Sequence, residues 1–190
     1  MSKSRSLQNS SQSHFFRSGM GEATRLPLDF FIRDVLDVAP ALIGKLLVRQ
    51  FDDGRIERYR ITETEAYRGI EDLACHASKG RTSRTEVMFW KGGTVYIYLI
   101  YGQYWLLNIV TGEEGDASAV LIRGIEGFSG PGRLGRELQL DRSFYGESLI
   151  NSERIWVEDA GPISEIKTSK RIGVEYAGEK WAGKLWRFSL

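Results

Sequence analysis

Two carboxylates and a tyrosine are the side chains of this sequence whose types and spacing could do chemistry. Glu63, Glu65 and Tyr67 occupy alternate positions in RITETEAYRG, residues 60–69, which ends a strand-like run. Residues two apart on a strand share a face and lie about 6.6 Å apart along the chain. This spacing is loosely compatible with the carboxylate pair of a glycoside hydrolase. A carboxylate at a strand end is nevertheless more often structural, so spacing alone does not define a catalytic pair.

A hairpin must position these carboxylates. Residues 45–51 and 55–67 are strand-like runs, and DDG at 52–54 predicts a turn because Asp and Gly tolerate positive φ. A carboxylate on an inward face needs hydrogen bonds or a catalytic use, since burial otherwise raises its pKa. Alternation along the second run predicts one face with Tyr59, Ile61, Glu63, Glu65 and Tyr67 and another with Thr62, Thr64 and Ala66.

Residues 92–112 predict a second hairpin, rich in tyrosine. Its turn falls near Gly102 and Gln103, which places Tyr101 and Tyr104 at a tip rather than in a core. The tyrosines of such a hairpin most often pack against the core, and the alternative is that they form a platform on which bases stack. Alternation separates a face with Val95, Ile97 and Leu99 from a face with Tyr96 and Tyr98.

Further strands and short helices complete the predicted fold. A strand at 117–127 brings Arg123 onto the face of Leu121 and Ile125. Pro is favoured at the first helical position, which predicts a helical segment at 40–44. Residues 130–140 also look helical, and 154–159 and 184–190 look like late strands. The expected class is α+β, a single compact domain with a mainly antiparallel sheet and flanking helices.

Composition limits the possible classes of protein. The 190 residues, 42% of them hydrophobic, suffice for one core, and no run approaches the about 18 apolar residues of a membrane span. Cys75 is the lone cysteine and only His14 and His76 accompany it, so we expect an intracellular protein without a zinc site. Residues 1–25 are rich in serine and predict a disordered tail before a domain at 26–190, with a transit peptide as the alternative.

Two segments are basic although the net charge is only +1. SKGRTSR at 78–84 carries no acid, and residues 164–190 hold six Lys or Arg against three Glu. Such segments form either a solvated face or a phosphate-binding groove, and charge alone does not decide between them.

The combination of these features is informative where each one alone is not. TETEAYRGIEDLACHASKGRTSRTEVMFWKGGTVYIYLIYGQYWLLNIVTGEEGDASAVLIRG, residues 62–124, closely resembles the alkyladenine (3-methyladenine) DNA glycosylase family. LPLDFFIRDVLDVAPALIGKLLVR resembles its opening, GPGRLGRELQL its GP-initiated helix and KRIGVEYAGEKWAGKLWRF its closing segment. The resemblance covers residues 26–188. It implies a curved antiparallel sheet or partial barrel, and hydrolysis of the N-glycosidic bond of alkylated or deaminated purines without strand cleavage.

The resemblance assigns a catalytic group. Glu65 matches the family's catalytic carboxylate, which accepts a proton from the attacking water and stabilises the cationic sugar. Arg123 matches a residue that positions this water, and the main-chain carbonyl of Ile172 matches a third water contact. We expect a structural role for Glu63, because the catalytic carboxylate of the family is the one immediately before AY, which is Glu65.

The resemblance also implies a pocket for a purine that has been flipped out of the duplex. Tyr67, His76 and Tyr98 match its stacking walls, and Leu121 belongs to the same pocket. The Ala74 carbonyl would contact the N6 edge of the base.

Two further positions imply contacts with DNA. Tyr101 matches the side chain that fills the gap left by the flipped nucleotide, a role suited to a bulky ring on a tight turn. Asn108 aligns with an asparagine that clashes with the exocyclic amino group of guanine. Gly102-Gln103 departs from the Gly-Met form associated with mammalian relatives. This difference affects the expected contacts of the hairpin tip with the DNA strands, and it does not affect the chemistry.

The expected partner is double-stranded DNA with damaged purines, bound by a monomer without cofactor or membrane, inside the cell where genomic DNA lies. Three rival interpretations remain open. A carbohydrate glycosidase would depend on two carboxylates. A nucleic-acid-binding module, such as a family member without activity, would not need Glu65. GPGRLG also hints at a helix-hairpin-helix glycosylase, although no helix is predicted before it.

Overall fold

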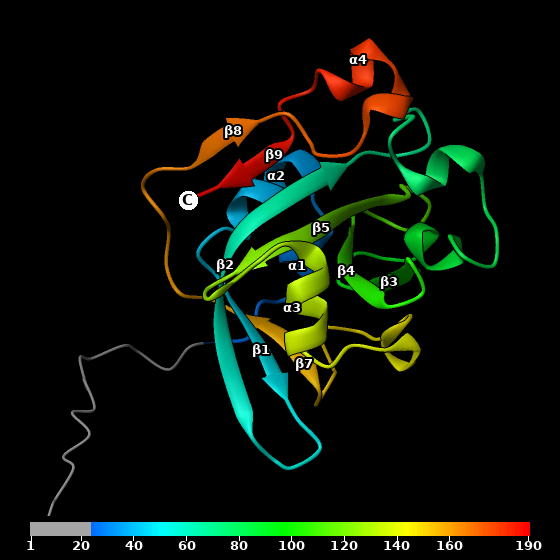
Figure 1. Ribbon diagram of the computed structural model, residues 1–190. Helices are drawn as coiled ribbons and strands as arrows, with labels where there is room; N and C mark the ends of the chain where they lie inside the picture. Colours follow the sequence, from blue (N-terminus) through cyan, green and yellow to red (C-terminus); the bar gives the residue numbers. More distant parts are fainter. Residues whose placement is uncertain (1–23) are drawn as a thin grey trace, which may run out of the picture.

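The computed structural model describes residues 24–190 and is organised around one antiparallel sheet (Figure 1). Within that range the strand order is β3-β4-β5-β2-β1-β7, with β6 beside β5, and with β9 beside β2 and β8. Every pairing is antiparallel, and β7 does not pair with β3, so the sheet is open. The strands are β1 Leu46–Gln50, β2 Ile56–Tyr67, β3 Val95–Ile100, β4 Tyr104–Thr111, β5 Ser118–Ile125, β6 Phe128–Ser129, β7 Ile155–Glu158, β8 Lys167–Ser169 and β9 Arg187–Ser189.

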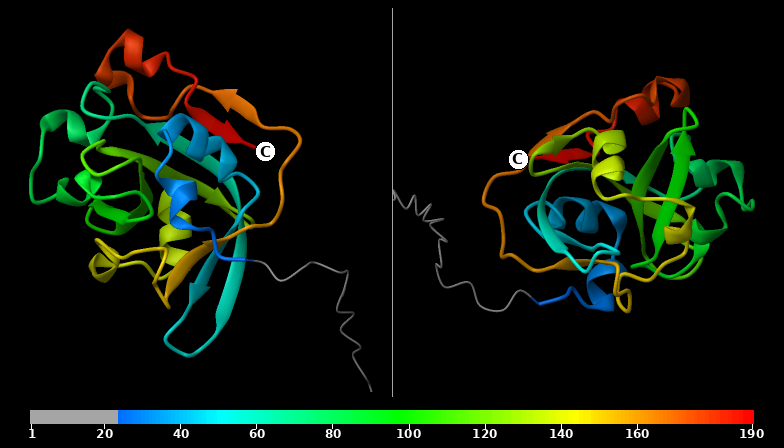
Figure 2. Two further views of the ribbon diagram at one scale, coloured as in Figure 1. Left: turned by 180° about the vertical axis from the view of Figure 1, so that it is seen from behind. Right: turned by 60° about the horizontal axis from the view of Figure 1, so that its bottom comes forward.

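Short helices lie on both faces of this sheet. Helix α2 lies behind β2 and β5 in Figure 1, α3 lies in front, and Figure 2 shows the reverse side. Thr64 of β2 donates to the Ala39 carbonyl of α2 at 2.9 Å, whereas Tyr59 of β2 contacts Glu137 of α3 at 3.0 Å. The predicted α+β class is confirmed. The helices are α1 Leu28–Phe31, α2 Val35–Ala41, α3 Pro131–Glu137 and α4 Glu179–Ala182, with 3-10 helices η1 His76–Lys79, η2 Glu86–Phe89, η3 Arg142–Phe144 and η4 Glu175–Ala177.

The two predicted hairpins are confirmed. Strands β1 and β2 pair from Leu46 opposite Arg60 to Gln50 opposite Ile56, and the turn at 52–54 joins them. Strands β3 and β4 pair from Val95 opposite Ile109 onward. No helix in residues 24–190 is long and apolar enough to cross a membrane.

Helix α2 corrects the helix predicted at 40–44. The helix begins earlier, at Val35, because the Asp34 side chain accepts a hydrogen bond from the Leu36 N–H at 2.8 Å and caps it. Pro40 is inside the last turn rather than at the first position. A proline there removes one hydrogen bond close to the helix end, where the helix stops at Ala41.

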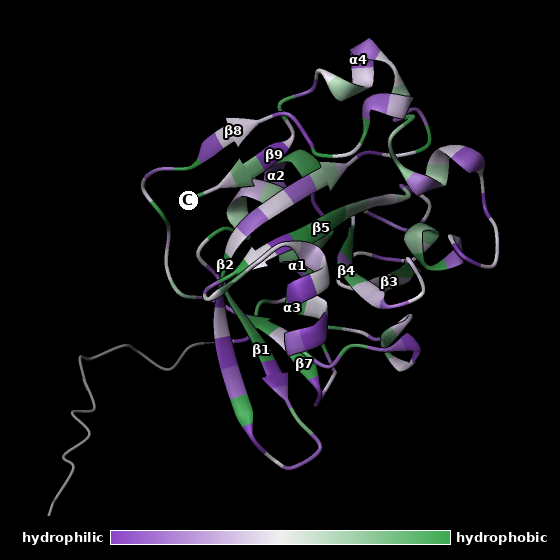
Figure 3. Cartoon of the chain, viewed as in Figure 1, coloured by the Kyte–Doolittle hydropathy of each residue, from purple (hydrophilic) through white to green (hydrophobic). Residues whose placement is uncertain are grey.

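The largest group of buried apolar side chains follows the central strands. Leu47, Ile61, Leu107, Val120 and Ile122 are fully buried members of this cluster. Figure 3 shows apolar colouring along β1 and β5, and polar colouring at the turn of the β1–β2 hairpin. The central strands thus form a rigid base for residues at their ends.

A close backbone approach seats helix α3 on the sheet. A Cβ atom on Gly135 would lie 2.0 Å from the Trp105 carbonyl oxygen of β4. Only glycine permits this distance, and the sequence places Gly135 at the point of contact.

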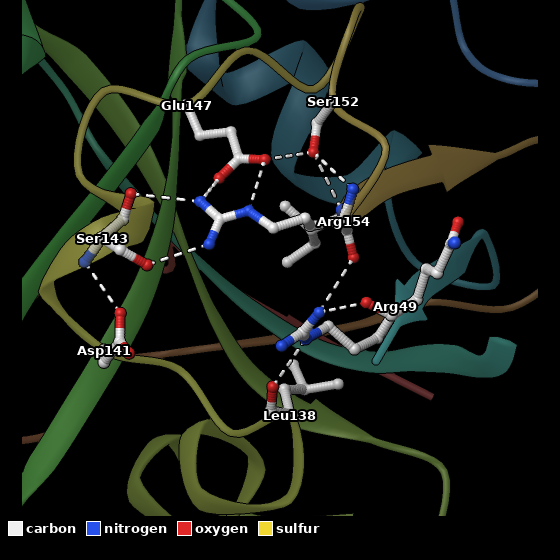
Figure 4. Close-up of polar contacts among 9 residues, drawn as sticks. Arg49, Leu138, Asp141, Ser143, Glu147, Ser152 and Arg154 are labelled. Atoms are coloured by element: carbon white, nitrogen blue, oxygen red, sulfur yellow. Dashed lines mark hydrogen bonds and ion pairs between the residues drawn. The ribbon is translucent and has the colours of Figure 1, made fainter. Parts of the chain in front are cut away.

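A polar network fixes the far end of α3 (Figure 4). Arg154 donates to both oxygens of the Glu147 carboxylate and to the Ser143 hydroxyl, the latter at 2.9 Å. Arg49 of β1 donates to the Leu138 carbonyl at 2.8 Å and to the Arg154 carbonyl at 3.4 Å. The network links the residue after α3 with strand β1 and with Arg154, the residue before β7.

The tail predicted at 1–25 falls outside the described residues except for Thr24 and Arg25. Arg25 forms a β-bridge with Glu158, and its Nη1 donates to the Ile150 carbonyl at 2.8 Å. Its guanidinium also lies 4.7 Å from the ring centroid of Trp156. Arg25 therefore belongs to the folded part of the chain.

Candidate active site

One cavity of about 470 Å³ collects residues that are widely separated in the sequence. Its wall is formed by the last residue of β2, by residues along β3, β4 and β5, by η1 and η2, by the start of α3, and by the segment from Ile172 into η4. Nine of the ten predicted site residues line it: Tyr67, Ala74, His76, Tyr98, Tyr101, Asn108, Leu121, Arg123 and Ile172.

The tenth predicted residue, Glu65, is completely buried in contact with three wall residues. Its Oε1 accepts a hydrogen bond from the Ile172 N–H at 2.8 Å, and its Oε2 accepts one from the Tyr67 hydroxyl at 2.8 Å. Arg123 approaches both oxygens at 3.5 Å. Burial raises the pKa of the Glu65 carboxyl, against the opposing effects of Arg123 and the two hydrogen bonds. A buried carboxylate with two hydrogen-bond donors and an arginine beside it is fixed in one orientation at the edge of the cavity.

The main chain of Ile172 contacts Glu65 through its N–H. The predicted contact is a different one, between the Ile172 carbonyl and a water, and it stays a prediction. The segment after β8 is thus adjacent to Glu65.

An irregularity in the sheet precedes Glu65. The register between β2 and β5 shifts on either side of Glu63, which lies opposite Gly124. A Cβ atom on Gly124 would lie 2.8 Å from the Thr62 hydroxyl, so a larger residue there would displace the Thr62 side chain. Glu63 itself accepts from Arg123 at 3.2 Å and from Arg187 at 3.1 Å. The structural role predicted for Glu63 stays a prediction, because Glu65 also contacts Arg123.

Aromatic rings form one wall of the cavity. His76 and Tyr98 meet edge to face with centroids 4.6 Å apart, and the Arg84 guanidinium lies 5.1 Å from the Tyr98 centroid. The buried Tyr96 places its hydroxyl 2.9 Å from His76 Nδ1. Burial, assisted by Arg84, lowers the pKa of His76 to about 4. His76 is therefore neutral at physiological pH, with one nitrogen as donor and the other as acceptor.

The polar edge of the cavity is partly occupied by internal hydrogen bonds. The Ala74 carbonyl accepts from the Tyr176 hydroxyl at 3.0 Å, and one carbonyl lone pair remains. Asn108 is buried, and its Nδ2 donates to the Tyr96 carbonyl at 3.2 Å and to the Leu106 carbonyl at 3.3 Å. These bonds fix the plane of the Asn108 amide inside the cavity.

Tyr101 projects from the turn between β3 and β4. Its side chain is 86% exposed, and its backbone has a φ of 50°, in the left-handed region. Such a conformation is uncommon for a residue with a Cβ atom. The ring borders the cavity mouth and has little protein around it, whereas Tyr104 packs against Arg136, whose guanidinium is 5.2 Å from its centroid.

The site offers little to a metal ion. In the described part of the chain, no group of three or more His, Cys, Asp or Glu side chains could hold one. Burial raises the pKa of the Cys75 thiol to about 12, which disfavours a thiolate. Arg123 lies beside both Glu63 and Glu65 and would repel a cation there.

Sequence reasoning missed several residues of the site: Asp72, Arg84, Tyr96, Arg171 and Tyr176. Two carried a local signal, because Arg84 is in the basic segment and Tyr96 shares a predicted face with Tyr98. Asp72 and Arg171 form a buried ion pair at 2.5 Å across a separation of 99 residues, and no local pattern predicts such a pair.

The sequence comparisons agree with this geometry. The profile of the family described as "Methylpurine-DNA glycosylase (MPG)" matches residues 29–129 and 127–190, so the chain belongs to that family. Relatives named "Putative 3-methyladenine DNA glycosylase" include a Methanocella arvoryzae protein, 45% identical over 183 residues covering 86% of this chain and 90% of its own. A Legionella pneumophila (strain Lens) protein of the same name is 45% identical over 175 residues, which cover 87% and 94% of the two chains.

Proposed function

We propose that the protein is a monofunctional DNA glycosylase that hydrolyses the N-glycosidic bond of alkylated or deaminated purines in duplex DNA and so starts base excision repair. The observation that carries the proposal is the buried Glu65 carboxylate, which adjoins an aromatic cavity whose mouth bears an exposed tyrosine. Family membership supports the same activity.

Glu65 is proposed as the general base. A water held between Glu65 and Arg123 attacks C1′ of the nucleotide while its proton passes to a Glu65 oxygen. Both electrons of the C1′–N9 bond leave with the base. The developing positive charge on the sugar is stabilised by the negative charge of Glu65. Arg123, within 3.5 Å of the carboxylate, orients the water and favours the ionised form of Glu65.

The cavity wall is proposed to hold the flipped purine. Tyr67, His76 and Tyr98 offer ring faces for stacking, while Leu121 and the Ala74 carbonyl contact the base edge. A cationic base such as 3-methyladenine or 7-methylguanine leaves as a neutral molecule. Uncharged hypoxanthine and ethenoadenine are poorer leaving groups and depend more on the pocket. Asn108 would oppose the amino group of normal guanine.

The surroundings of the cavity are proposed to bind duplex DNA. Tyr101 fills the gap left by the flipped nucleotide, since its exposed ring is free to enter the base stack. Lys and Arg of 78–84 and 164–190, apart from the buried Arg171, contact phosphates. We further propose that the protein acts as a monomer, without a cofactor, inside the cell where the genomic DNA lies.

The test is excision from duplex oligonucleotides that each carry one damaged purine. Excess enzyme releases the free base, and strands break only after alkali if no lyase step occurs. Glu65→Gln keeps the shape of the side chain and removes its charge and basicity. The excision rate should fall about 10²-fold or more while binding of lesion DNA survives.

Glu63→Gln is the matched control, because it neutralises the neighbouring carboxylate that also pairs with Arg123. Its excision rate should fall much less than that of Glu65→Gln. A wild-type protein that binds lesion DNA but releases no base would instead be a damaged-DNA-binding module. Full activity of Glu65→Gln would reject Glu65 as the base and leave Glu63 as the next candidate.

A further inference from the structure

The segment that contacts Glu65 is not held by the sheet. Strand β8 ends at Ser169 and η4 begins at Glu175, so Ile172 lies between regular elements. The Ile172 side chain is 50% exposed, so burial of its own side chain does little to fix it. Another contact must hold its N–H at 2.8 Å from Glu65.

The neighbouring residue Arg171 supplies that contact. Its side chain and that of Asp72 are both completely inaccessible to solvent, and they pair through two hydrogen bonds of 2.5 and 3.0 Å. Arg171 also donates to the Ala66 carbonyl at 2.9 Å and to the Trp181 carbonyl at 3.2 Å. Four hydrogen bonds therefore fix the residue immediately before Ile172.

Arg171 also contacts the second hydrogen-bond donor to Glu65. Its guanidinium carbon lies 4.8 Å from the ring centroid of Tyr67, and the Tyr67 hydroxyl donates to Glu65 Oε2. A cation over an aromatic face is attracted by the ring and restricts its tilt. The same guanidinium is 5.1 Å from the Trp186 centroid, so it lies between two rings.

We propose that the Asp72–Arg171 ion pair is a positioning element that holds the Ile172 N–H and the Tyr67 hydroxyl on the two oxygens of Glu65. The inference rests on the proposed function, because it concerns how the general base is oriented. Neither Asp72 nor Arg171 touches a reacting atom.

Stability alone does not account for this pair. Removing two charges from water costs several kcal/mol per ion, and apolar side chains of similar volume often serve stability equally well. The planar guanidinium instead fixes directions, because its donors leave in a rigid fork. Here those directions join Ala66 of β2, the Asp72 loop and the Trp181 carbonyl of α4 to the segment that contacts Glu65.

Asp72→Asn and Arg171→Lys test the proposal. Asp72→Asn keeps shape and removes the charge, whereas Arg171→Lys keeps the charge and removes the fork. Both should raise the pKa of the Glu65 carboxyl by about one unit, because weakened donation to a carboxylate favours its protonated form. The pKa is read from the carbon-13 carboxyl shift, assigned by comparison with Glu65→Gln. The acid limb of the single-turnover excision rate should move to higher pH by the same amount, with lesion binding retained.

Glu158→Gln is the control for lost stability. Glu158 is buried and pairs with Arg58 through two hydrogen bonds of 2.8 and 3.2 Å, away from the cavity. This variant should unfold at lower urea concentration and keep the wild-type Glu65 pKa and acid limb. Loss of stability in Asp72→Asn with an unchanged Glu65 pKa would overturn the proposal.

The double variant Asp72→Asn with Arg171→Gln covers the case in which a single variant does not fold. It buries no unpaired charge, and its two amides can still bond to each other. It should show the raised Glu65 pKa, and a wild-type value would overturn the proposal. The Glu65 pKa and the excision assay together distinguish failure of the positioning role from failure of the proposed function. Excision by wild type with an unshifted variant pKa rejects the positioning role alone, whereas no base release by wild type rejects the proposed function, and with it the positioning of a general base.

Discussion

The Tyr67 hydroxyl allows the environment of Glu65 to be tested by removal of a single atom. Tyr67→Phe keeps the ring in the cavity wall and removes the donor that lies 2.8 Å from Glu65 Oε2. A hydrogen bond to a charged group contributes about 1.5–3 kcal/mol. Because one pKa unit corresponds to about 1.4 kcal/mol, its loss should raise the pKa of Glu65 by about one to two units.

The direction of the effect on rate follows from the role of Glu65. The base works as a carboxylate, so the excision rate falls as pH drops through its pKa. A higher pKa in Tyr67→Phe moves this acid limb to higher pH and leaves the rate on the alkaline side nearly unchanged.

Single-turnover excision of hypoxanthine at a series of pH values measures this acid limb, since hypoxanthine does not gain charge over the pH range in which Glu65 is protonated. Tyr98→Phe removes a hydroxyl from the same cavity that forms no hydrogen bond with Glu65, and its acid limb should coincide with wild type. A wild-type acid limb in Tyr67→Phe would refute the reasoning.

Three further predictions concern DNA and stability. Tyr101→Ala should lower the flipped population of an ethenoadenine duplex, which is read by fluorescence, and should lower the excision rate of all lesions by a similar factor, whereas Tyr98→Ala should affect lesions unequally. An unchanged fluorescence signal in Tyr101→Ala would show that Tyr101 does not fill the gap left by the flipped nucleotide. Binding to undamaged duplex should weaken steeply with salt, and a flat response would argue against phosphate contacts. Gly135→Ala should destabilise the fold by about 3 kcal/mol, because its Cβ would lie 2.0 Å from the Trp105 carbonyl oxygen. Urea unfolding measures this change, and an unchanged midpoint would contradict the close approach.

Local patterns predicted the strands well. The alternation of residues 95–100 and 104–111 and the turn residues at 52–54 gave both hairpins, because these signals act over a few neighbours. The same reasoning misplaced the first long helix. Pro40 predicts a helix start, whereas the Asp34 side chain caps the helix six residues earlier.

The candidate site was predictable only in part. The resemblance supplied residues that line one cavity, from Tyr67 to Ile172, without the hydrogen bonds that join them. The contact between the Ile172 N–H and Glu65 spans 107 residues, and its donor could not be chosen from sequence. The register shift at Glu63 was equally hidden, because it depends on the pairing of β2 with β5, which lie far apart in the sequence.

The conformation of Tyr101 has a consequence for protein engineering. A left-handed backbone at a residue with a Cβ atom costs about 1 kcal/mol, and 86% of this large side chain faces water. Glycine would relieve the backbone and remove the exposed ring, so selection for thermal stability alone would favour its replacement. If the ring enters the base stack, such stabilised variants would lose repair activity while folding better, and directed evolution of this protein should hold position 101 fixed.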